Sequence, residues 1–534
     1  MLKKKLPVGI DDFKEIIENN YYFIDKSMLI SELLDKKSKV TLLPRPRRFG
    51  KTLNMSMLNY FFNIENSSKN KELFKDLAIY NSDQMKYQGE YPVIYISLKD
   101  IKVNNWDLCL NKIKLLLEEE YSKYDLILED NRGSQENSLL ELSKFLYEKY
   151  KKKVIILIDE YDTPLVTAHS QGYYEEAIFF FRNFLSAGLK GNPYLEFSVL
   201  TGILRIAKES IFSGLNNLAV DTILTNDFKY FGLTESEVEE MLNYYELNYE
   251  LEEVKKWYNG YHFGEELVYN PWSLVNFASK KRLESYWVNT SDNSLIKQLL
   301  EKNDKKVFEE LELIFKGETI WETISENIVF DDLNNINTIW SLMLFSGYLT
   351  CQEKKVSAIT GFTSYSLRIP NQEIKNFFRQ SFIETYTKGN VHFYGTMMED
   401  LFLGNLDSFV NKFKKMYITA ISYHDTGDNE KYYHHFMLGL LLTLGDKYII
   451  KSNRESGYGR YDIALEPKDK NNYGLIFEFK IGDKNSLEEK AKEALNQINE
   501  KKYDIEMKNN GVSKVIKIGM AFSGKDVAIE SIID

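Results

Sequence analysis

The sequence KVTLLPRPRRFGKT, residues 39–52, decides the fold class of this chain. It begins with a short apolar run, residues 39–43, that is typical of a buried strand, and it leads into residues 53–62, which have helical periodicity. The turn between them ends in Gly50-Lys51-Thr52. A phosphate requires converging backbone N–H groups at a helix N-terminus, a lysine, and a hydroxyl group for magnesium. The sequence therefore predicts a phosphate-binding loop.

The loop departs from the usual pattern at one position. Arg45 stands where G-x-x-x-x-G-K-[ST] has its first glycine. We predict that Gly50, Lys51 and Thr52 bind the nucleotide and that Thr52 also binds magnesium. Three arginines are expected to add positive charge around the triphosphate: Arg45, Arg47 and Arg48. The alternatives are a loop of a different shape or a chance GKT in a basic turn.

A second strand signal ends in acidic residues. The apolar residues 154–158 are followed by Asp159-Glu160-Tyr161-Asp162. The carboxyl ends of parallel strands are where α/β sheets bind ligands, so we predict that Asp159 binds magnesium and that Glu160 orients or deprotonates the attacking water. The alternative is a solvated acidic turn after a core strand.

Further strands alternate with helical segments in the first half of the chain. Strands are predicted at residues 91–98 and 196–201, with a helix at 106–124, and this alternation favours a parallel α/β sheet. Thr201 ends its strand where a polar group could sense the γ-phosphate. Arg205 follows and could stabilise the charge that develops on transfer, although a surface arginine fits equally well.

The last part of the chain contains a second group of charged residues. Asp462 lies in one predicted strand, and Glu478 and Lys480 lie two positions apart in the next, residues 474–481. Residues two apart in a strand share a face. We predict that Asp462 and Glu478 bind a metal ion and that Lys480 positions or activates water for phosphodiester hydrolysis. The alternative is an exposed strand face with alternating charges.

The chain resembles bacterial AAA-ATPase-like proteins that carry a C-terminal PD-(D/E)XK nuclease-like domain. The motifs that carry the resemblance are LPVGIDDFKEIIENNYYFIDKS (residues 6–27), PRPRRFGKT (44–52), LIDEYDTPL (157–165), TGILRIAKESIFSGLNNL (201–218), WYNGYHFG (257–264) and YNPWSL (269–274). The family tolerates an arginine at position 45. The resemblance implies that residues 22–26 lie near the adenine.

The resemblance also implies a domain layout and further site residues. We expect an AAA-like core at residues 1–233, a helical lid and winged-helix-like region at 234–390, and the nuclease-like domain at 391–534. Glu430, on a helix before the strands, would complete the metal site. Gln497 and Tyr503 resemble the Gln…Tyr helix motif of related nucleases, although their spacing is wider than Q-x-x-x-Y.

Composition limits the alternatives. The 534 residues have 43% hydrophobic and 28% charged residues, typical of globular proteins with sizeable cores. Two cysteines and six scattered histidines do not suggest a structural zinc site, and a net charge of −11 argues against bulk coating of nucleic acid. No membrane segment or signal peptide is expected, so we predict a cytoplasmic location.

The sequence therefore favours an ATP- and Mg²⁺-dependent protein coupled to a nuclease-like domain. We expect a nucleic acid, DNA in the first place, as partner, and we allow for assembly of several copies. Two other hypotheses remain open. One is a nucleotide-regulated switch or scaffold that binds without cleaving, and the other is a non-nucleolytic DNA-binding module.

Overall fold

The chain forms two compact units. The first comprises Met1–Ser291 and Trp321–Glu373, and the second comprises Asp292–Ile320 and Ile374–Asp534. The computed structural model describes residues 3–128, 134–206, 218–225, 227–288, 305–315, 317–328, 336–420, 430–452, 455–456 and 459–534.

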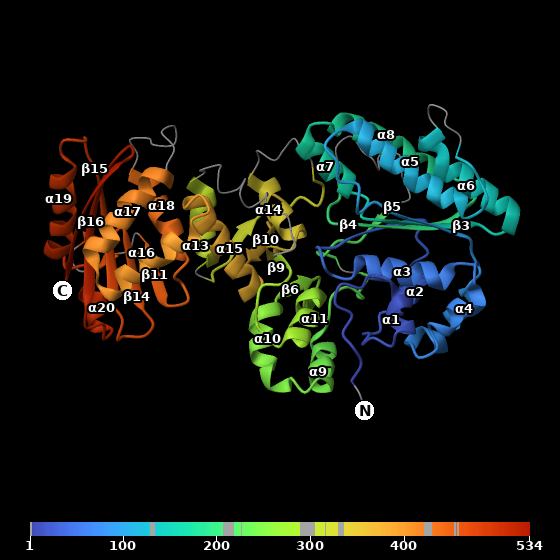
Figure 1. Cartoon of the computed structure of the whole chain (residues 1–534), viewed down its shortest axis with the longest axis horizontal. Helices are drawn as coiled ribbons and strands as arrows, with labels where there is room; N and C mark the ends of the chain where they lie inside the picture. The colour runs from blue at the N-terminus through green and yellow to red at the C-terminus, as the bar shows by residue number, and fades with distance from the viewer. Residues whose placement is uncertain are drawn as a thin grey trace. The chain divides into compact units, whose positions relative to one another are not determined.

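A five-stranded parallel sheet organises the first unit (Figure 1). Its order is β2-β3-β4-β1-β5, so β4 lies between the strand before the GKT loop and the strand that ends in Asp159. The strands are β1 (Val40–Pro44), β2 (Val93–Ser97), β3 (Val154–Asp159), β4 (Leu195–Gly202) and β5 (Leu218–Val220). Every residue of β1 and β3 is buried, as expected of strands covered on both faces.

Helices cover both faces of this sheet. Figure 1 shows α5, α6 and α8 on one face and α3 on the other. In α5, the Asn105 side chain caps the helix by accepting from Leu108 N at 3.0 Å, and Cys109, Ile113 and Leu117 repeat every four residues on the buried side. The helices are α1 (Phe13–Glu18), α2 (Leu29–Lys36), α3 (Lys51–Phe62), α4 (Ser67–Glu72), α5 (Trp106–Ser122), α6 (Ser134–Tyr150), α7 (Thr163–Gln171) and α8 (Tyr174–Leu189).

A small helical subdomain follows in the first unit. Its first helix begins with a capping box, in which the side chains of Thr234 and Glu237 each accept from the other's backbone N–H. Buried residues of all three helices share one core that includes Met241, Tyr258 and Leu274. The elements are α9 (Glu235–Tyr244), α10 (Leu251–Tyr258), α11 (Pro271–Lys280) and the two-stranded β6 (Tyr261–Phe263) and β7 (Glu266–Val268).

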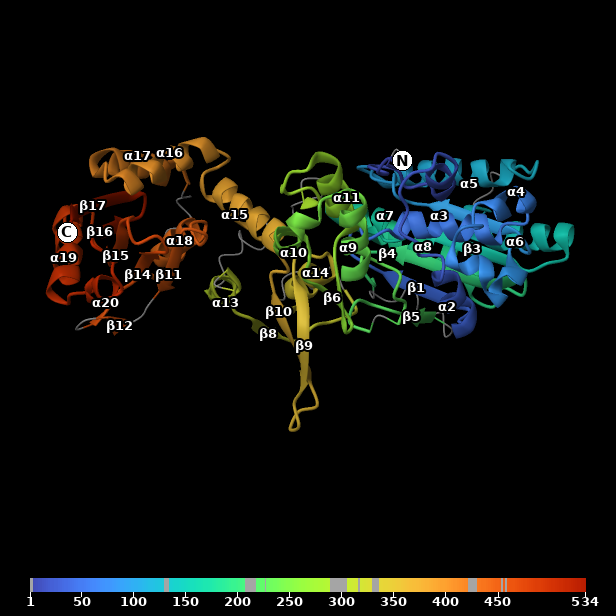
Figure 2. The same ribbon diagram turned by 90° about the horizontal axis from the view of Figure 1, so that it is seen from below.

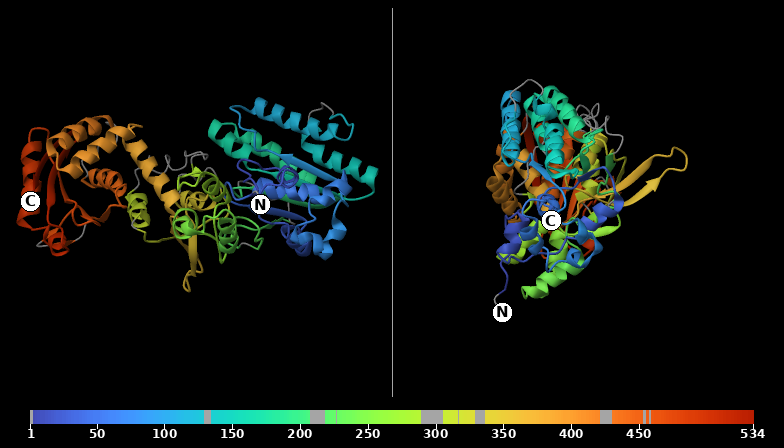
Figure 3. Two further views of the ribbon diagram at one scale, coloured as in Figure 1. Left: turned by 60° about the horizontal axis from the view of Figure 1, so that its bottom comes forward. Right: turned by 90° about the vertical axis from the view of Figure 1, so that its right-hand side faces the viewer.

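A three-stranded sheet with the order β8-β10-β9 completes the first unit. Its β9–β10 hairpin projects away from the neighbouring elements (Figures 2 and 3). The elements are β8 (Ile320–Glu322), α14 (Ile336–Phe345), β9 (Thr350–Val356) and β10 (Thr363–Arg368). They occupy the part of the chain where a winged-helix-like segment was expected.

The second unit is built on a mixed sheet with the order β11-β14-β15-β16-β17. Only the β15–β16 pair is parallel, and α19 connects these two strands. Gly519 in β16 permits close packing of this helix, because a Cβ there would lie 2.4 Å from the Ala491 carbonyl oxygen. The strands are β11 (Tyr448–Ser452), β14 (Ile463–Pro467), β15 (Gly474–Ile481), β16 (Val515–Ser523) and β17 (Asp526–Ile533), with a separate β12 (Glu455–Ser456) and β13 (Gly459–Arg460) hairpin.

Helices pack around this second sheet. They are α13 (Lys305–Phe315), α15 (Gln372–Tyr386), α16 (Val391–Leu403), α17 (Leu406–Ala420), α18 (Glu430–Leu442), α19 (Leu487–Glu500) and α20 (Ile505–Asn509). Phe315 of α13 contacts Phe378 and Phe382 of α15, with ring centroids 5.8 and 5.3 Å apart. Helix α15 begins in the first unit, because Glu373 belongs there and Ile374 to the second.

The predicted fold class, a P-loop-type parallel α/β sheet followed by a second α/β domain, is confirmed. The strand predicted to contain Asp462 begins instead at Ile463, and β17 was not predicted. The three-part division at residues 233 and 390 stays a prediction. None of the helices in the described ranges is both long and apolar enough to cross a bilayer.

Candidate functional site

The GKT loop has the backbone geometry of an anion site. Gly50 caps α3 with φ +83°, a conformation that favours glycine, and Arg48 also has a positive φ of 67°. Phe49 is buried between Tyr261 and Phe263, with ring centroids 5.0 Å from each. These contacts fix the loop so that the N-terminus of α3 remains open to a ligand.

Lys51 is held by the loop itself and by the acidic strand. Its Nζ lies 3.1 and 3.2 Å from the carbonyl oxygens of Arg45 and Pro46, and 3.3 Å from Oε1 of Glu160. The side chain is almost fully buried, so Glu160 supplies the counter-charge that a buried ammonium needs. Phosphate oxygens could replace these partners without leaving the ammonium unpaired.

Asp159, the last residue of β3, contacts β4 and the start of α3. Its Oδ2 accepts a hydrogen bond from Thr52 Oγ1 at 2.8 Å, and its Oδ1 accepts from Thr201 Oγ1 at 2.5 Å. Burial, and then the neighbouring charge of Glu160, raises the pKa of Asp159. The structure thus brings together Thr52, Asp159 and Thr201, as the sequence predicted. A hydroxyl beside a carboxylate is a donor set that suits magnesium.

Glu160 faces the loop from a strained backbone position. Its φ is +57°, which is uncommon for a residue other than glycine and is typical of functional sites. Burial acts to raise the pKa of Glu160, but the Lys51 ammonium, with Arg47 and Lys102, outweighs burial and lowers the pKa below its ordinary value. The carboxylate therefore stays ionised, as a group that orients or deprotonates water must be.

A pocket of about 420 Å³ opens over the loop. Five of its lining residues are cationic and three are acidic, which suits a polyanion bound with a divalent cation. Arg48 stacks on Trp272, with its guanidinium carbon 4.1 Å from the ring centroid. The charged lining residues are Arg47, Arg48, Lys51, Lys99, Lys102, Asp11, Asp100 and Glu160, and the apolar ones include Pro7, Ile10, Ile203, Pro271 and Val275.

The leader segment contributes to this pocket through different residues than expected. Residues 7 and 9–11 line it, ahead of the predicted 22–26. Tyr22 instead packs against Tyr244 and Tyr245, with ring centroids 5.0 and 5.4 Å away, and Lys26 binds Glu237 at 2.6 Å. These contacts attach residues 22–26 to the helical subdomain.

The prediction that Arg45 faces the triphosphate is corrected by its surroundings. Its side chain is fully buried, and its guanidinium binds the Asp221 carboxylate at 2.6 Å and the carbonyl oxygens of Asp221 and Phe228 at 2.5 and 3.2 Å. A guanidinium with these partners stabilises the loop through buried contacts and does not face the pocket. Arg47 and Arg48 line the pocket, and their role around a triphosphate stays a prediction.

The segment after Thr201 is held by two residues that sequence analysis did not single out. Asp162 Oδ2 accepts from the backbone N–H groups of Ile203 and Leu204, both at 2.8 Å, and the Tyr161 hydroxyl donates to the Leu204 carbonyl at 2.7 Å. Burial, and then the Glu160 charge, raises the pKa of Asp162 to about 6. Arg205 lies in this segment, half-buried, and is not part of the described pocket lining, so its catalytic role stays a prediction.

The second unit brings the three predicted charged residues together. Asp462 lies just before the paired part of β14, whose Ile463 is opposite Phe477. Asp462 Oδ2 accepts from the Phe479 backbone N–H at 2.7 Å, and Lys480 Nζ lies 3.5 Å from Glu478 Oε1. Burial, and then the charge of Asp462, raises the pKa of Glu478 to about 8.

Gln497 and Tyr503 join this site despite their wide spacing. Gln497 Nε2 donates to Glu478 Oε1 and, at 3.2 Å, to the Tyr503 hydroxyl. The Tyr503 hydroxyl donates in turn to the Arg460 carbonyl at 2.8 Å. The amide therefore orients the buried carboxylate, and the tyrosine orients the amide.

The donor set in the second unit fits a divalent cation. Glu478 is 3% exposed, and its Oε2 is a buried oxygen without a hydrogen-bond partner among the described atoms. The nearby Asp462 carboxylate and the raised pKa of Glu478 indicate negative charge at this site that a cation would offset. Within the described residues, no group of three or more His, Cys, Asp or Glu converges as a metal cage. The Glu430 side chain lies outside the described residues, although α18 begins at this residue.

His434 of α18 also reaches the site and was not predicted as part of it. Its Nε2 lies 3.3 Å from the Asp462 carbonyl oxygen and 3.1 Å from Ser452 Oγ. A buried imidazole with two hydrogen-bond partners acts here on the backbone of Asp462. No local sequence pattern marks this contact, because the three residues come from α18, β11 and the bend before β14.

Two family models match separate regions of the chain. The model of predicted AAA-ATPases matches residues 7–212, and that of the PD-(D/E)XK nuclease superfamily matches residues 428–532. The two matches have the layout that the sequence predicted, an AAA-ATPase-like region followed by a PD-(D/E)XK nuclease-like one. We therefore refer to the first unit as the ATPase unit and to the second as the nuclease-like unit.

Two individual proteins are also similar to this AAA-ATPase-like chain. An uncharacterized protein in the vnfD 5′ region of Azotobacter chroococcum mcd 1 is 27% identical over 540 residues, covering 98% of this chain and 97% of the relative. The ORC2 protein of Aeropyrum pernix, in its ADPNP–ADP complexes, matches 66% of this chain and 91% of its own, with 10% identity and a TM-score of 0.26. A score this low supports no structural conclusion.

Proposed function

We propose that the chain is a magnesium-dependent ATPase whose nucleotide state controls a divalent-metal-dependent DNA nuclease. One shared observation carries this proposal: in each unit a lysine meets two neighbouring carboxylates. Lys51 pairs with Glu160 beside Asp159, and Lys480 pairs with Glu478 near Asp462. Such groups are suited to bind phosphates and to move a proton at water.

In the ATPase unit, each residue has a role that follows from its contacts. Lys51 would exchange the carbonyl oxygens of Arg45 and Pro46 for phosphate oxygens, which releases Glu160 to accept a proton from water. A magnesium ion bound at Thr52 and Asp159 would neutralise phosphate charge. Thr201 would report the state of Asp159 to the segment held by Asp162, because its hydroxyl donates to the Asp159 carboxylate.

In the nuclease-like unit, the same chemistry would act on a phosphodiester. Asp462 and Glu478 would hold a divalent cation, which supplies Lewis-acid activation. Lys480 would orient water and stabilise the developing negative charge, while Gln497 keeps Glu478 in place. A Glu478 carboxyl with a pKa of about 8 holds a proton at neutral pH, so cation binding must displace it.

Cleavage assays test the nuclease half. Linear DNA, circular DNA and RNA should be incubated with Mg²⁺ or Mn²⁺, using the wild type, Asp462→Asn and Lys480→Ala. We expect both variants to lose about 100-fold or more in rate. Lys484→Ala is a matched control, because Lys484 is a highly exposed lysine in the connection between β15 and α19, and its ion pair in the described structure is with Asp526. Equal cleavage by wild type and both site variants would refute the nuclease assignment.

A second set of variants tests the coupling. Lys51→Ala should lose ATP binding, and Glu160→Gln should bind ATP without efficient hydrolysis. If nucleotide state controls cleavage, these two variants should hold the DNA cleavage rate at two different levels. Lys75→Ala is the control, since Lys75 is exposed and is not one of the described residues that line the pocket. Identical cleavage by all four proteins, with and without ATP, would contradict coupling.

A nucleotide-regulated switch is the second candidate, and the contacts of Lys51 favour it. The loop lysine contacts Glu160 and two carbonyl oxygens, and phosphate oxygens would be an alternative set of partners, so the lysine can alternate between two sets of contacts. A switch requires two states of this kind. Slow hydrolysis that Glu160→Gln does not change, together with nucleotide-dependent assembly, would support the switch over the ATPase.

A further inference from the structure

The tip of the β9–β10 hairpin, residues 354–362, exposes an unusual number of apolar side chains. Val356, Ile359 and Phe362 are 64%, 96% and 69% exposed. The tip is nevertheless ordered by its own hydrogen bonds, since Ser357 N donates to the Phe362 carbonyl at 2.9 Å and Gly361 N donates to the Ser357 carbonyl at 2.8 Å. Figures 2 and 3 show the hairpin extending into solvent. Such a projection suits insertion into a partner.

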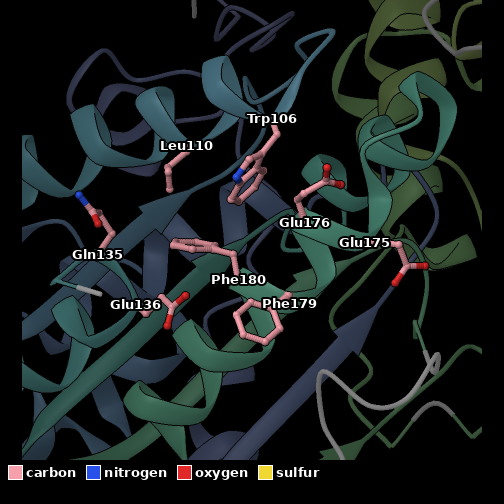
Figure 4. A pocket seen from close by; sticks show the side chains of 8 residues that line it. All are labelled: Trp106, Leu110, Gln135, Glu136, Glu175, Glu176, Phe179 and Phe180. Atoms are coloured by element: carbon pink, nitrogen blue, oxygen red, sulfur yellow. The ribbon is translucent and has the colours of Figure 1, made fainter. Parts of the chain in front are cut away.

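The ATPase unit also has a pocket of complementary chemistry on its outer helical layer. This aromatic pocket, of about 560 Å³, lies between α5, α6 and α8 (Figure 4). Trp106, Phe179 and Phe180 present their rings to it, and Phe179 is 60% exposed. Glu136 and Glu176 lie at its edge. None of the eight described residues that line it is a lysine or an arginine.

We propose that the hairpin tip of one copy of the chain inserts into the aromatic pocket of a second copy. Ile359 and Phe362 supply apolar groups for the rings, as interface anchors do. The tip sequence KKVSAITGF has two lysines and no acidic residue, and the pocket edge is acidic. Lys355 already lies over the Trp321 ring at 3.7 Å, so Lys354 is the cation that would meet Glu176.

The two surfaces are different, so the tip of one copy always meets the pocket of another. Two copies can exchange tips in a two-fold dimer, or each copy can use its tip on one neighbour and its pocket on another, which closes into a ring or continues as an open chain. Nucleic acid is a less suitable occupant of the tip, because two lysines with three exposed apolar side chains offer few phosphate contacts and the chain carries a net charge of −11.

This asymmetry provides a sharp test. Phe362→Asp destroys the tip and keeps the pocket, whereas Phe179→Asp destroys the pocket and keeps the tip. Sedimentation velocity of the full chain at roughly 100 µM should show assemblies for the wild type and single chains for each variant. A 1:1 mixture of the variants should form dimers and nothing larger, because only one tip–pocket contact remains. Leu403→Asp is a matched control, as Leu403 is 71% exposed in α16.

A charge exchange provides an independent measure of the same contact. Lys354→Glu and Glu176→Lys should each weaken assembly about tenfold, and the double variant should recover most of the loss. A wild type that remains a single chain, or a variant mixture that forms no dimer, would overturn the proposal. So would a tip variant that loses DNA affinity while the assembly size stays that of the wild type.

Discussion

Replacing Arg45 with alanine should destabilise the ATPase unit rather than remove a phosphate contact. The guanidinium is fully buried and pairs with Asp221 at 2.6 Å. Its loss leaves a buried carboxylate without its counter-charge, which typically costs about 3–5 kcal/mol. Asp221 would keep hydrogen bonds from the backbone N–H groups of Asp227 and Phe228 at 2.6 and 3.1 Å. We therefore expect about 3 kcal/mol, the lower end of that range.

Tryptophan fluorescence makes this measurement selective. All six tryptophans belong to the ATPase unit: Trp106, Trp257, Trp272, Trp287, Trp321 and Trp340. A urea titration followed by their emission thus reports unfolding of that unit alone. Arg47→Ala is the matched control, since Arg47 lines the pocket. It should change the free energy of unfolding by less than about 0.5 kcal/mol and weaken ATP binding about tenfold or more.

The opposite pattern would refute the reasoning. If Arg45→Ala leaves the urea midpoint unchanged and weakens ATP binding as Arg47→Ala does, then Arg45 faces the phosphates. The buried ion pair with Asp221 would then not represent the functional loop. Arg45→Met adds a useful comparison, because an apolar side chain of similar length restores packing but not the counter-charge.

Three further outcomes are expected. Glu160→Gln should lower the ATP hydrolysis rate about 100-fold or more while ATP binding is kept, because an amide cannot accept the proton of water. Mn²⁺ affinity of the nuclease-like unit should rise from about pH 5 to pH 8, since the pKa of Glu478 is raised from 4.5 to about 8 and the cation competes with its proton. Burial raises the pKa of Glu373 from 4.5 to about 7. Between these two pH values the native state binds more protons than the unfolded state. The free energy of unfolding of the ATPase unit should therefore fall as the pH rises from about 4.5 to about 7.

Each of these outcomes has its own check. For Glu160→Gln, a fluorescent ATP analogue measures binding separately, and unchanged hydrolysis would contradict the assigned role. For Glu478, calorimetry in two buffers of different ionisation enthalpy counts the released protons, and Glu478→Gln should flatten the pH dependence. For Glu373, the difference between urea titrations at pH 5 and pH 8 should become smaller in Glu373→Gln, with Asp162 contributing the remainder, and an unaltered difference would contradict the prediction.

Sequence alone predicted those parts of the site whose signal is local. A strand, a turn and a helix follow each other directly at the GKT loop, and period-two alternation puts Glu478 and Lys480 on one strand face. Arg45 was placed incorrectly because its partner, Asp221, is 176 positions away and leaves no local pattern. The contacts of Asp162 and His434 were not predicted for the same reason, because their partners are backbone groups of segments distant in sequence.

The Gln497–Tyr503 pair shows a different limit. In sequence the two residues are too far apart for one helix face, but α19 ends at Glu500. Lys502 then takes a left-handed φ of 54°, and Tyr503 N donates back to the Ile498 carbonyl at 3.2 Å. This reversal returns the tyrosine to Gln497. Spacing rules assume an uninterrupted helix, so they do not predict a contact formed by a residue beyond the end of the helix.

The chain passes between the two units three times, and this limits how such a protein can be cut or recombined. The crossings fall after residues 291, 320 and 373. A fragment that starts at residue 374 would lack α13, whose Phe315 covers Phe378 and Phe382. Exchange of the nuclease-like unit between genes would therefore need two simultaneous transfers. A single breakpoint would yield products with an uncovered apolar surface, so we expect the two units to be inherited together.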